Sequence, residues 1–116
     1  GGGRMVNIGA VSAPKGQIGQ ATFATAKAAM HGFSRALANE VATRGVTINP
    51  IPPGYLASQS ISSSPPDVLD RLAGSVPIRR LGKPEEVASL CAWLASDDAA
   101  YVTGADYAVN GGLHMF

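Results

Sequence analysis

The chain has 116 residues, of which 46% are hydrophobic and 15% are charged, and its formal net charge is +1. This length allows a single domain with a modest core, and without any block of like charges the sequence gives no indication of a nucleic acid or an anionic membrane surface as partner. No apolar run reaches the roughly 18 residues of a membrane-spanning helix.

The first part of the chain predicts a strand, a loop and a long helix. Residues 4–8 form a short apolar strand, residues 9–19 a loop, and residues 20–43 a helix whose apolar side chains recur at helical spacing. Alanines lie on several sides of this helix, so we expect it to pack both on a sheet and on another helix. Gly45 is expected to end it in the left-handed conformation.

The second part predicts two more strands, with helices and a flap between them. The expected elements are, in chain order, a strand at 46–49, a serine-rich mobile flap at 56–66, helices starting at 66 and 84, and a strand at 106–109. The tight link from the long helix to the strand at 46–49 favours a parallel crossover. Pro50 is expected to stop that strand because proline lacks an amide donor. In the helix from residue 84, the stripe of apolar side chains comprises Val87, Leu90, Cys91 and Leu94.

The loop and the helix that follow the first strand carry a site-like pair. Phe23 and Lys27 are four residues apart, so they project from one face of the helix as neighbours. A cationic side chain placed beneath a loop at the end of a strand is a site geometry of open α/β sheets. The alternative is a solvated helical lysine, and the loop context favours the site.

Four segments resemble the short-chain dehydrogenase/reductase family, in that family's order and over nearly the whole chain. They are RMVNIGAV, the helix around Lys27, VTINPIPPGYLAS, and PEEVASLCAWLASDDAAYVTGADYAVNGG. The resemblance implies an α/β fold, the C-terminal part of a Rossmann-like doubly wound parallel sheet with about three strands and flanking helices, as one domain over residues 1–116. The Gly-rich turn that binds the cofactor in the family's N-terminal half has no counterpart here.

Within this family, the stretches KGQIGQ, PGYLAS and GGLHM are most similar to acetoacetyl-CoA reductases and 3-oxoacyl-carrier-protein reductases. The resemblance therefore implies an NADPH-dependent oxidoreductase that reduces a 3-oxoacyl thioester to a 3-hydroxyacyl thioester. Lys27 matches the lysine that lowers the pKa of the family's tyrosine and holds the nicotinamide ribose. Phe23 stands at the tyrosine position and Ala10 at the serine position.

These two replacements predict a chain that is inactive or nearly so. Phe23 has no proton to give and Ala10 has no hydroxyl, whereas a general acid contributes about 10²–10⁴-fold and an oxyanion donor about 10²–10³-fold. Ser12, Thr22 and Tyr55 are the residues that could substitute, and we expect that none does.

The resemblance also implies residues for the cofactor and the substrate. Those at positions that face the cofactor are Lys27, Pro53, Gly54, Tyr55 and Ser58, with Asn49 fitting the same segment. Those at positions that line the acyl-thioester pocket are Gln17, Gln20 and Tyr55. A plain Pro-Gly turn and a polar loop are the alternatives. The two histidines have no companions at ligand spacing, so we expect no metal site.

Two functional interpretations remain open. The chain is either the remnant of a reductase or a non-catalytic assembly module or degenerate fragment of the family. Its low charge and apolar helix predict a homo-oligomer, or a complementary N-terminal half, as partner. The single Cys91 excludes an intramolecular disulfide, and with no apolar leader at Gly1 we expect a cytoplasmic protein.

Overall fold

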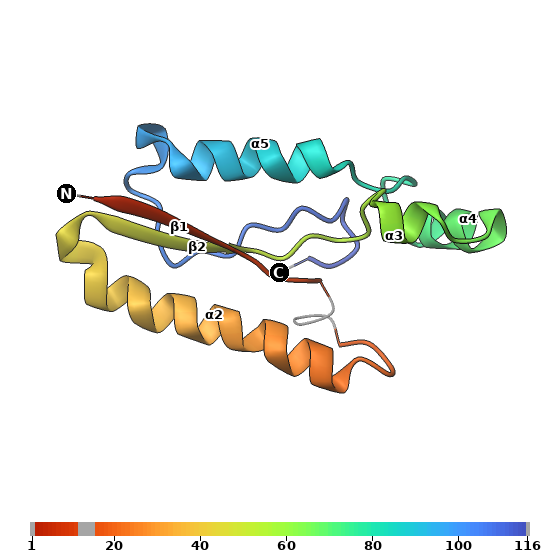
Figure 1. The fold of residues 1–116 in the computed structure, drawn as a ribbon, viewed down its shortest axis with the longest axis horizontal. Helices are drawn as coiled ribbons and strands as arrows, with labels where there is room; N and C mark the ends of the chain where they lie inside the picture. Colours follow the sequence, from red (N-terminus) through yellow and green to blue (C-terminus); the bar gives the residue numbers. More distant parts are fainter. Residues whose placement is uncertain (1, 12–15, 116) are drawn as a thin grey trace.

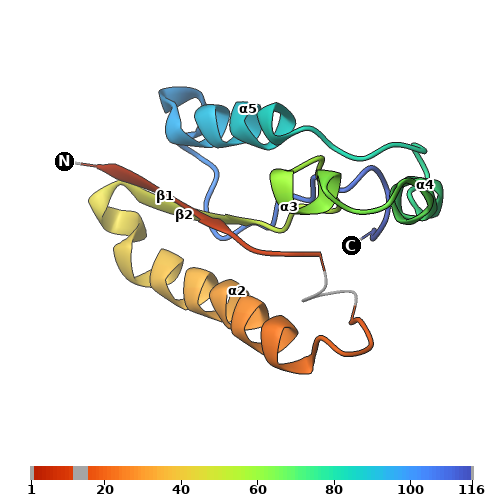
Figure 2. The same cartoon turned by 45° about the vertical axis from the view of Figure 1, so that its right-hand side comes forward.

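The computed structural model describes residues 2–11 and 16–115. It confirms the α/β class, with a parallel sheet between helices. The elements are, in chain order, β1 (Gly3–Ile8), α2 (Ala21–Val41), a 3-10 turn (Ala42–Arg44), β2 (Val46–Ile51), α3 (Gln59–Ser62), α4 (Pro66–Ser75), α5 (Pro84–Ala95) and a second 3-10 turn (Asp97–Ala99). Helix α2 covers one face of the strands and α5 covers the other, while α3 and α4 project beyond the end of the sheet (Figure 1, Figure 2).

Strands β1 and β2 run parallel, as predicted, in a register that pairs Gly3 with Val46 and Ile8 with Ile51. The expectation that Pro50 stops β2 is wrong, because the strand continues to Ile51. Pro50 is tolerated because its missing amide lies on the side of β2 away from β1. There only its carbonyl is used, and it accepts a hydrogen bond of 3.0 Å from the Tyr107 amide.

The predicted third strand at 106–109 does not form as a regular strand. The segment does run beside β2, where the amides of Gly104 and Tyr107 donate to carbonyls of β2. Its only parallel bridge in the described part of the chain pairs Val109 with Pro53. The prolines that follow Asn49 offer no amides to the carbonyls of a third strand, so a continuous ladder cannot form.

Side chains replace the absent ladder bonds. Asn49, which is 1% exposed, donates through Nδ2 to the Val102 carbonyl at 2.9 Å and accepts at Oδ1 from the Ala105 amide at 3.2 Å. The hydroxyl of Thr103 accepts from the Ile48 amide at 3.0 Å. Asn49 is therefore a buried structural residue, and a role for it in the cofactor segment stays a prediction.

Asn49→Ala is expected to destabilise the fold by about 2–4 kcal/mol, because it leaves a buried carbonyl and a buried amide without partners. The midpoint of urea unfolding measures this change. Asn39→Ala is the matched control, because Asn39 is exposed on α2 and should change stability by less than about 0.5 kcal/mol. Equal effects of the two substitutions would contradict the role given to Asn49.

Helix α2 ends as predicted and packs differently from the prediction. Gly45 follows it with a φ of 72°, the left-handed conformation. Only one side of the helix is covered, and its buried residues are His31, Ser34 and Ala38. On the opposite side Phe33 is 56% exposed, and a Cβ added at Gly32 would have no neighbour within 4 Å. The expected second packing surface is thus uncovered by the described residues.

The core lies between α5 and the sheet. It comprises the buried residues Ile51, Val87, Leu94 and Ala99, with Leu90 and Cys91 packed against them. The apolar stripe predicted for this helix is confirmed. The predicted flap at 56–66 contains α3 and a bridge between Leu56 and Gly82, and its mobility stays a prediction. None of the helices in the described part of the chain is long and apolar enough to cross a membrane.

Candidate functional site

Lys27 lies where the sequence predicts, at the carboxyl end of β1. Its Nζ is 3.4 Å from the Ile8 carbonyl, the last of the strand, and 5.7 Å from the centre of the Phe23 ring. Phe23 is 46% exposed, so this residue borders solvent and is not part of the core. An ammonium and an aromatic ring are therefore held together by helical spacing and by the end of the strand.

The loop after β1 brings Ala10 to the segment that follows β2. The Gly9 amide donates to the Ile51 carbonyl at 2.8 Å, and the Val11 amide donates to the Pro53 carbonyl at 3.0 Å. Ala10 is half-buried between these two hydrogen bonds. The family's serine position thus adjoins the Pro-Gly segment.

Of the candidates for rescue, Ser12 lies outside the described residues. Thr22 is exposed on α2 next to Phe23. Tyr55 is half-buried, and its hydroxyl is the acceptor of another contact, described next. Whether any of them acts in place of the absent groups stays a prediction.

Two of the three residues predicted to line a substrate pocket touch each other. The Nε2 of Gln17 donates to the Tyr55 hydroxyl at 3.3 Å, which joins the loop before α2 to the loop after β2. The Gln20 amide donates to the Gln17 carbonyl at 3.1 Å, so the two glutamines share one turn at the start of α2. The polar cluster exists, and its ligand is untested.

The segment of Pro53 and Gly54 packs against the C-terminal part of the chain. A Cβ at Gly54 would lie 2.8 Å from Cα and Cβ of Asn110, so only glycine fits there. The Gly54 amide donates to the Val109 carbonyl at 2.8 Å. Ser58 precedes α3, and its Oγ is 3.2 Å from the Ser60 hydroxyl. A structural reason therefore suffices for Gly54, and a cofactor contact by these residues remains a prediction.

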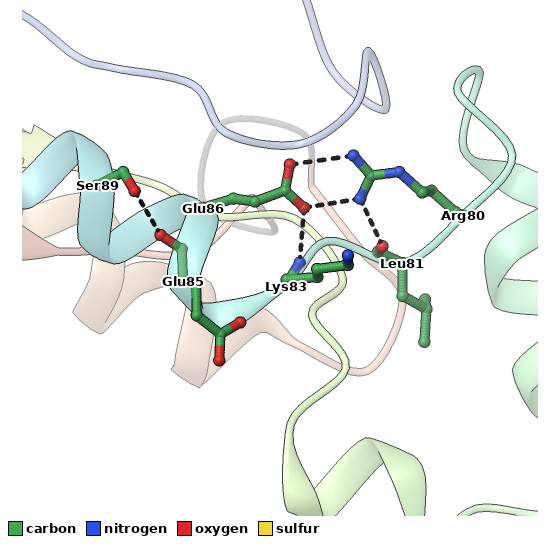
Figure 3. A network of polar contacts seen from close by, with 6 residues as sticks. All are labelled: Arg80, Leu81, Lys83, Glu85, Glu86 and Ser89. Atoms are coloured by element: carbon green, nitrogen blue, oxygen red, sulfur yellow. Dashed lines mark hydrogen bonds and ion pairs between the residues drawn. The ribbon is translucent and has the colours of Figure 1, made fainter.

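Sequence reasoning missed an ion pair at the start of α5. Arg80 donates two hydrogen bonds to the carboxylate of Glu86, at 2.7 and 3.0 Å, and the Lys83 amide donates a third at 3.0 Å (Figure 3). The pair borders a cavity of about 210 Å³ beside Tyr55. The two glutamates after Pro84 allowed the start of the helix to be predicted from the sequence. They gave no indication that Arg80 would be the partner of Glu86.

These contacts change the titration of Glu86. Hydrogen bonding from Arg80, and then from the Lys83 amide, lowers the pKa of the Glu86 carboxyl from 4.5 to about 2, and the same pair raises the pKa of Arg80. A carboxyl whose pKa is lowered by folding stabilises the fold above its unfolded pKa. That contribution is lost as the pH falls through the folded value.

Glu86→Gln is therefore expected to flatten the dependence of the unfolding midpoint on pH between about 4.5 and about 2. Thermal or urea unfolding across this window measures the effect. Glu85→Gln is the control, because the Glu85 side chain points away from Arg80 (Figure 3). An unchanged pH dependence in Glu86→Gln would count against the ion pair.

Within residues 2–11 and 16–115, no three His, Cys, Asp or Glu side chains form a group that could hold a metal ion. The candidate site consists of side chains from one helix and two loops. Helix α2 supplies Lys27 and Phe23, and the neighbouring loops supply Ala10, Gln17 and Tyr55.

Comparison with known proteins gives a consistent result. A family model described as enoyl-(acyl carrier protein) reductase matches residues 1–114. The chain is 54% identical over 113 residues to an acetoacetyl-CoA reductase of Cupriavidus necator, covering 97% of this chain and 46% of the relative. Over the same coverage it is 46% identical to an acetoacetyl-CoA reductase of Allochromatium vinosum and to the 3-oxoacyl-[acyl-carrier-protein] reductase FabG of Pseudomonas aeruginosa. The chain thus spans about half the length of these curated relatives.

Proposed function

The chain belongs to the short-chain dehydrogenase/reductase family, and on that premise we propose that it carries part of the site of an NADPH-dependent reductase of 3-oxoacyl thioesters. As it stands it does not catalyse the reaction. The proposal takes its substrate class from relatives that are acetoacetyl-CoA and 3-oxoacyl-carrier-protein reductases.

One observation carries the proposal. Lys27 is placed against position 23, with its Nζ 5.7 Å from the ring centre, yet position 23 holds phenylalanine. A phenol there would have its pKa lowered by the ammonium and could give its proton to a carbonyl oxygen. A phenyl ring has no such proton. The chain therefore keeps Lys27, which would activate a phenol at position 23, but it lacks the phenol itself.

The second loss concerns the substrate's oxygen. Ala10 is held between the Gly9 and Val11 hydrogen bonds, where the family has its serine. A methyl group cannot donate a hydrogen bond to the negative charge that develops on a carbonyl oxygen. Both direct contacts to that oxygen are therefore absent from this chain.

The family implies a nicotinamide cofactor, and the residues present fit it in part. Lys27 contacts a backbone carbonyl at 3.4 Å and has no carboxylate partner among the described residues, so its ammonium can hold a ribose hydroxyl. Pro53, Gly54, Tyr55 and Ser58 are the remaining candidates for cofactor contacts. The nicotinamide, when bound, supplies the hydride. The binding loop for its pyrophosphate has no counterpart in this sequence.

For the substrate we propose the Gln17–Tyr55 contact as one wall of the acyl-thioester pocket, with Gln20 beside it. The amide and the phenol hydroxyl can reorganise to bind the carbonyl and amide groups of an acyl-CoA chain. Tyr55 belongs to both the cofactor and the substrate candidates, as expected where the two ligands meet.

The experiment that tests this proposal is NADPH oxidation by the purified chain in the presence of acetoacetyl-CoA. We expect no turnover above a control without protein, since the acid, the oxyanion donor and the pyrophosphate loop are all absent. Turnover that Lys27→Ala abolishes would contradict the proposal. Turnover that survives Lys27→Ala would come from a contaminant and calls for repurification.

A second candidate function, assembly, is favoured by the uncovered side of α2. Phe23 and Phe33 are exposed by 46% and 56%, and Ala26, Met30 and Leu37 share their side of the helix by spacing. Such an apolar stripe is typical of an interface. We propose a second copy, or a complementary half of the fold, as the partner.

A further inference from the structure

Asp106, in the C-terminal segment, contacts two residues of α2, His31 and Arg35. Its Oδ2 accepts a hydrogen bond of 2.8 Å from Arg35, and its Oδ1 lies 3.0 Å from His31 Nδ1. The side chains of His31 and Asp106 are only 10% and 15% exposed, whereas that of Arg35 is 57% exposed. The ring N–H is not in line with Oδ1, so the contact is a close electrostatic pair rather than an ideally aligned hydrogen bond.

The opposite edge of the His31 ring faces the candidate site. A Cβ built on Gly9 would lie 3.5 Å from His31 Nε2, so Gly9 lies against this edge of the ring. Gly9 precedes Ala10, the family's serine position. The same side of α2 contacts β1 at two other points, where Lys27 reaches the Ile8 carbonyl and Ser34 accepts from Asn7 at 2.9 Å. His31 is the middle of these three contacts.

The surroundings decide which ring nitrogen of the neutral imidazole carries the proton. Nδ1 lies 3.0 Å from a carboxylate oxygen, which only accepts hydrogen bonds, so a bare Nδ1 would bring two electron-rich atoms into repulsive contact. Nε2 is buried and has no hydrogen-bond partner among the described residues. A donor left unpaired there would cost the desolvation of an N–H group.

We infer that His31 is a positioning residue for the candidate site: Asp106 holds its imidazole as the Nδ1–H tautomer, and the ring in turn sets the position of Gly9 and hence of residue 10. This inference deepens the proposed function, because it gives the loop at residues 9–11 its support. Arg35 balances the carboxylate charge from the solvent side. The carboxylate of Asp106 is therefore paired with the Arg35 cation through Oδ2, while its Oδ1 remains available as an acceptor for His31.

The first test uses the unchanged chain and ¹⁵N NMR of its histidine rings at mildly alkaline pH. The expected result for His31 is a protonated Nδ1 and a bare Nε2, the reverse of the tautomer that free histidine favours. A proton on Nε2, or on both nitrogens, would overturn the inference. Neither cofactor nor turnover enters this measurement, so activity of the purified chain would refute the proposed function and leave the tautomer result standing.

The second test compares His31→Asn with His31→Leu. The asparagine variant keeps an N–H donor near the position of Nδ1 but lacks the part of the ring that meets Gly9, whereas the leucine variant keeps volume without a donor for Asp106. The amide NMR signals of Gly9 and Val11 should shift in both variants, because the position of Gly9 depends on both the contact with Asp106 and the ring edge at Gly9. Arg35→Ala is the control and should leave these signals unchanged. Unchanged signals in His31→Leu would show that the ring only fills space, and unchanged signals in His31→Asn would show that its edge does not position Gly9; either result would overturn the inference.

Discussion

Phe23→Tyr is expected to raise NADPH oxidation by about 10²–10⁴-fold once the chain follows the N-terminal half of a curated acetoacetyl-CoA reductase in one polypeptide. The fusion supplies the cofactor turn that this sequence lacks, and the chain is 54% identical to one such relative over nearly its whole length. The gain comes from a phenol placed beside Lys27, whose ammonium favours the phenolate. The rate of NADPH consumption with acetoacetyl-CoA measures it.

The chain offers a matched control for this substitution. Phe33→Tyr makes the same chemical change on the same helix, at a residue that is 56% exposed and away from Lys27. It should leave the rate of the fusion unchanged. A gain in Phe33→Tyr equal to that in Phe23→Tyr would show that position 23 is not special. In the isolated chain, Phe23→Tyr together with Ala10→Ser is expected to remain inactive, because the pyrophosphate loop is still absent.

The second large effect concerns association of the isolated chain. The Gly3 and Gly9 amides donate toward β2, so alternation along the strand leaves the amides of Arg4, Val6 and Ile8 on the outer edge of β1. In the described part of the chain no strand pairs with that edge. Unpaired strand edges recruit further strands. The apolar stripe of α2, defined above by its five residues, is partly uncovered as well, because Phe23, Ala26 and Phe33 are exposed while Met30 and Leu37 are half-buried.

Burying these surfaces favours an assembly strongly. A standard interface of about 1,600 Å² has a gross hydrophobic term of about 20 kcal/mol at about 25 cal/mol per Å² of its apolar part. After an association cost of about 4–15 kcal/mol is subtracted, about 5–16 kcal/mol remains, which is comparable to the roughly 5–15 kcal/mol of net stability of a domain. We therefore expect a dimer or larger assembly at micromolar concentration, or a poorly folded chain, and not a stable monomer.

Sedimentation velocity, with near-ultraviolet circular dichroism of Trp93 as a reporter of packing, tests this expectation. Ile8→Pro removes one outward amide without touching the bonds between β1 and β2, and Phe33→Lys places a charge on the apolar stripe. Each variant should shift the chain toward smaller species if its surface takes part. A compact monomer with a cooperative melt in the unchanged chain would refute the argument from the open edge.

Local spacing allowed much of this structure to be predicted from the sequence. Phe23 and Lys27 are one helical turn apart, so their proximity follows from the helix alone. Gly45 marks the end of α2 because few other residues adopt its left-handed conformation. The parallel pairing of β1 with β2 follows from a short link between helix and strand.

The features that the sequence did not reveal depend on distant side chains. Nothing local indicates that Asn49 would bind the segment from Val102 to Ala105 and so replace a third strand. The prediction that Pro50 ends β2 failed because only the tertiary arrangement shows which side of the strand needs amides. The contact between His31 and Asp106 likewise joins residues far apart in sequence.

The central claim is that Lys27 is placed to activate an acid at position 23, and titration of an introduced phenol tests it most directly. The isolated chain carries either Phe23→Tyr or Phe33→Tyr, with ¹³C-labelled tyrosine followed by NMR across the alkaline range. We predict a lower pKa for the phenol at position 23 than for the phenol at position 33, because the ammonium stabilises the phenolate. Adding Lys27→Ala should remove the difference. Equal pKa values for the two phenols, with Lys27 in place, would contradict the account.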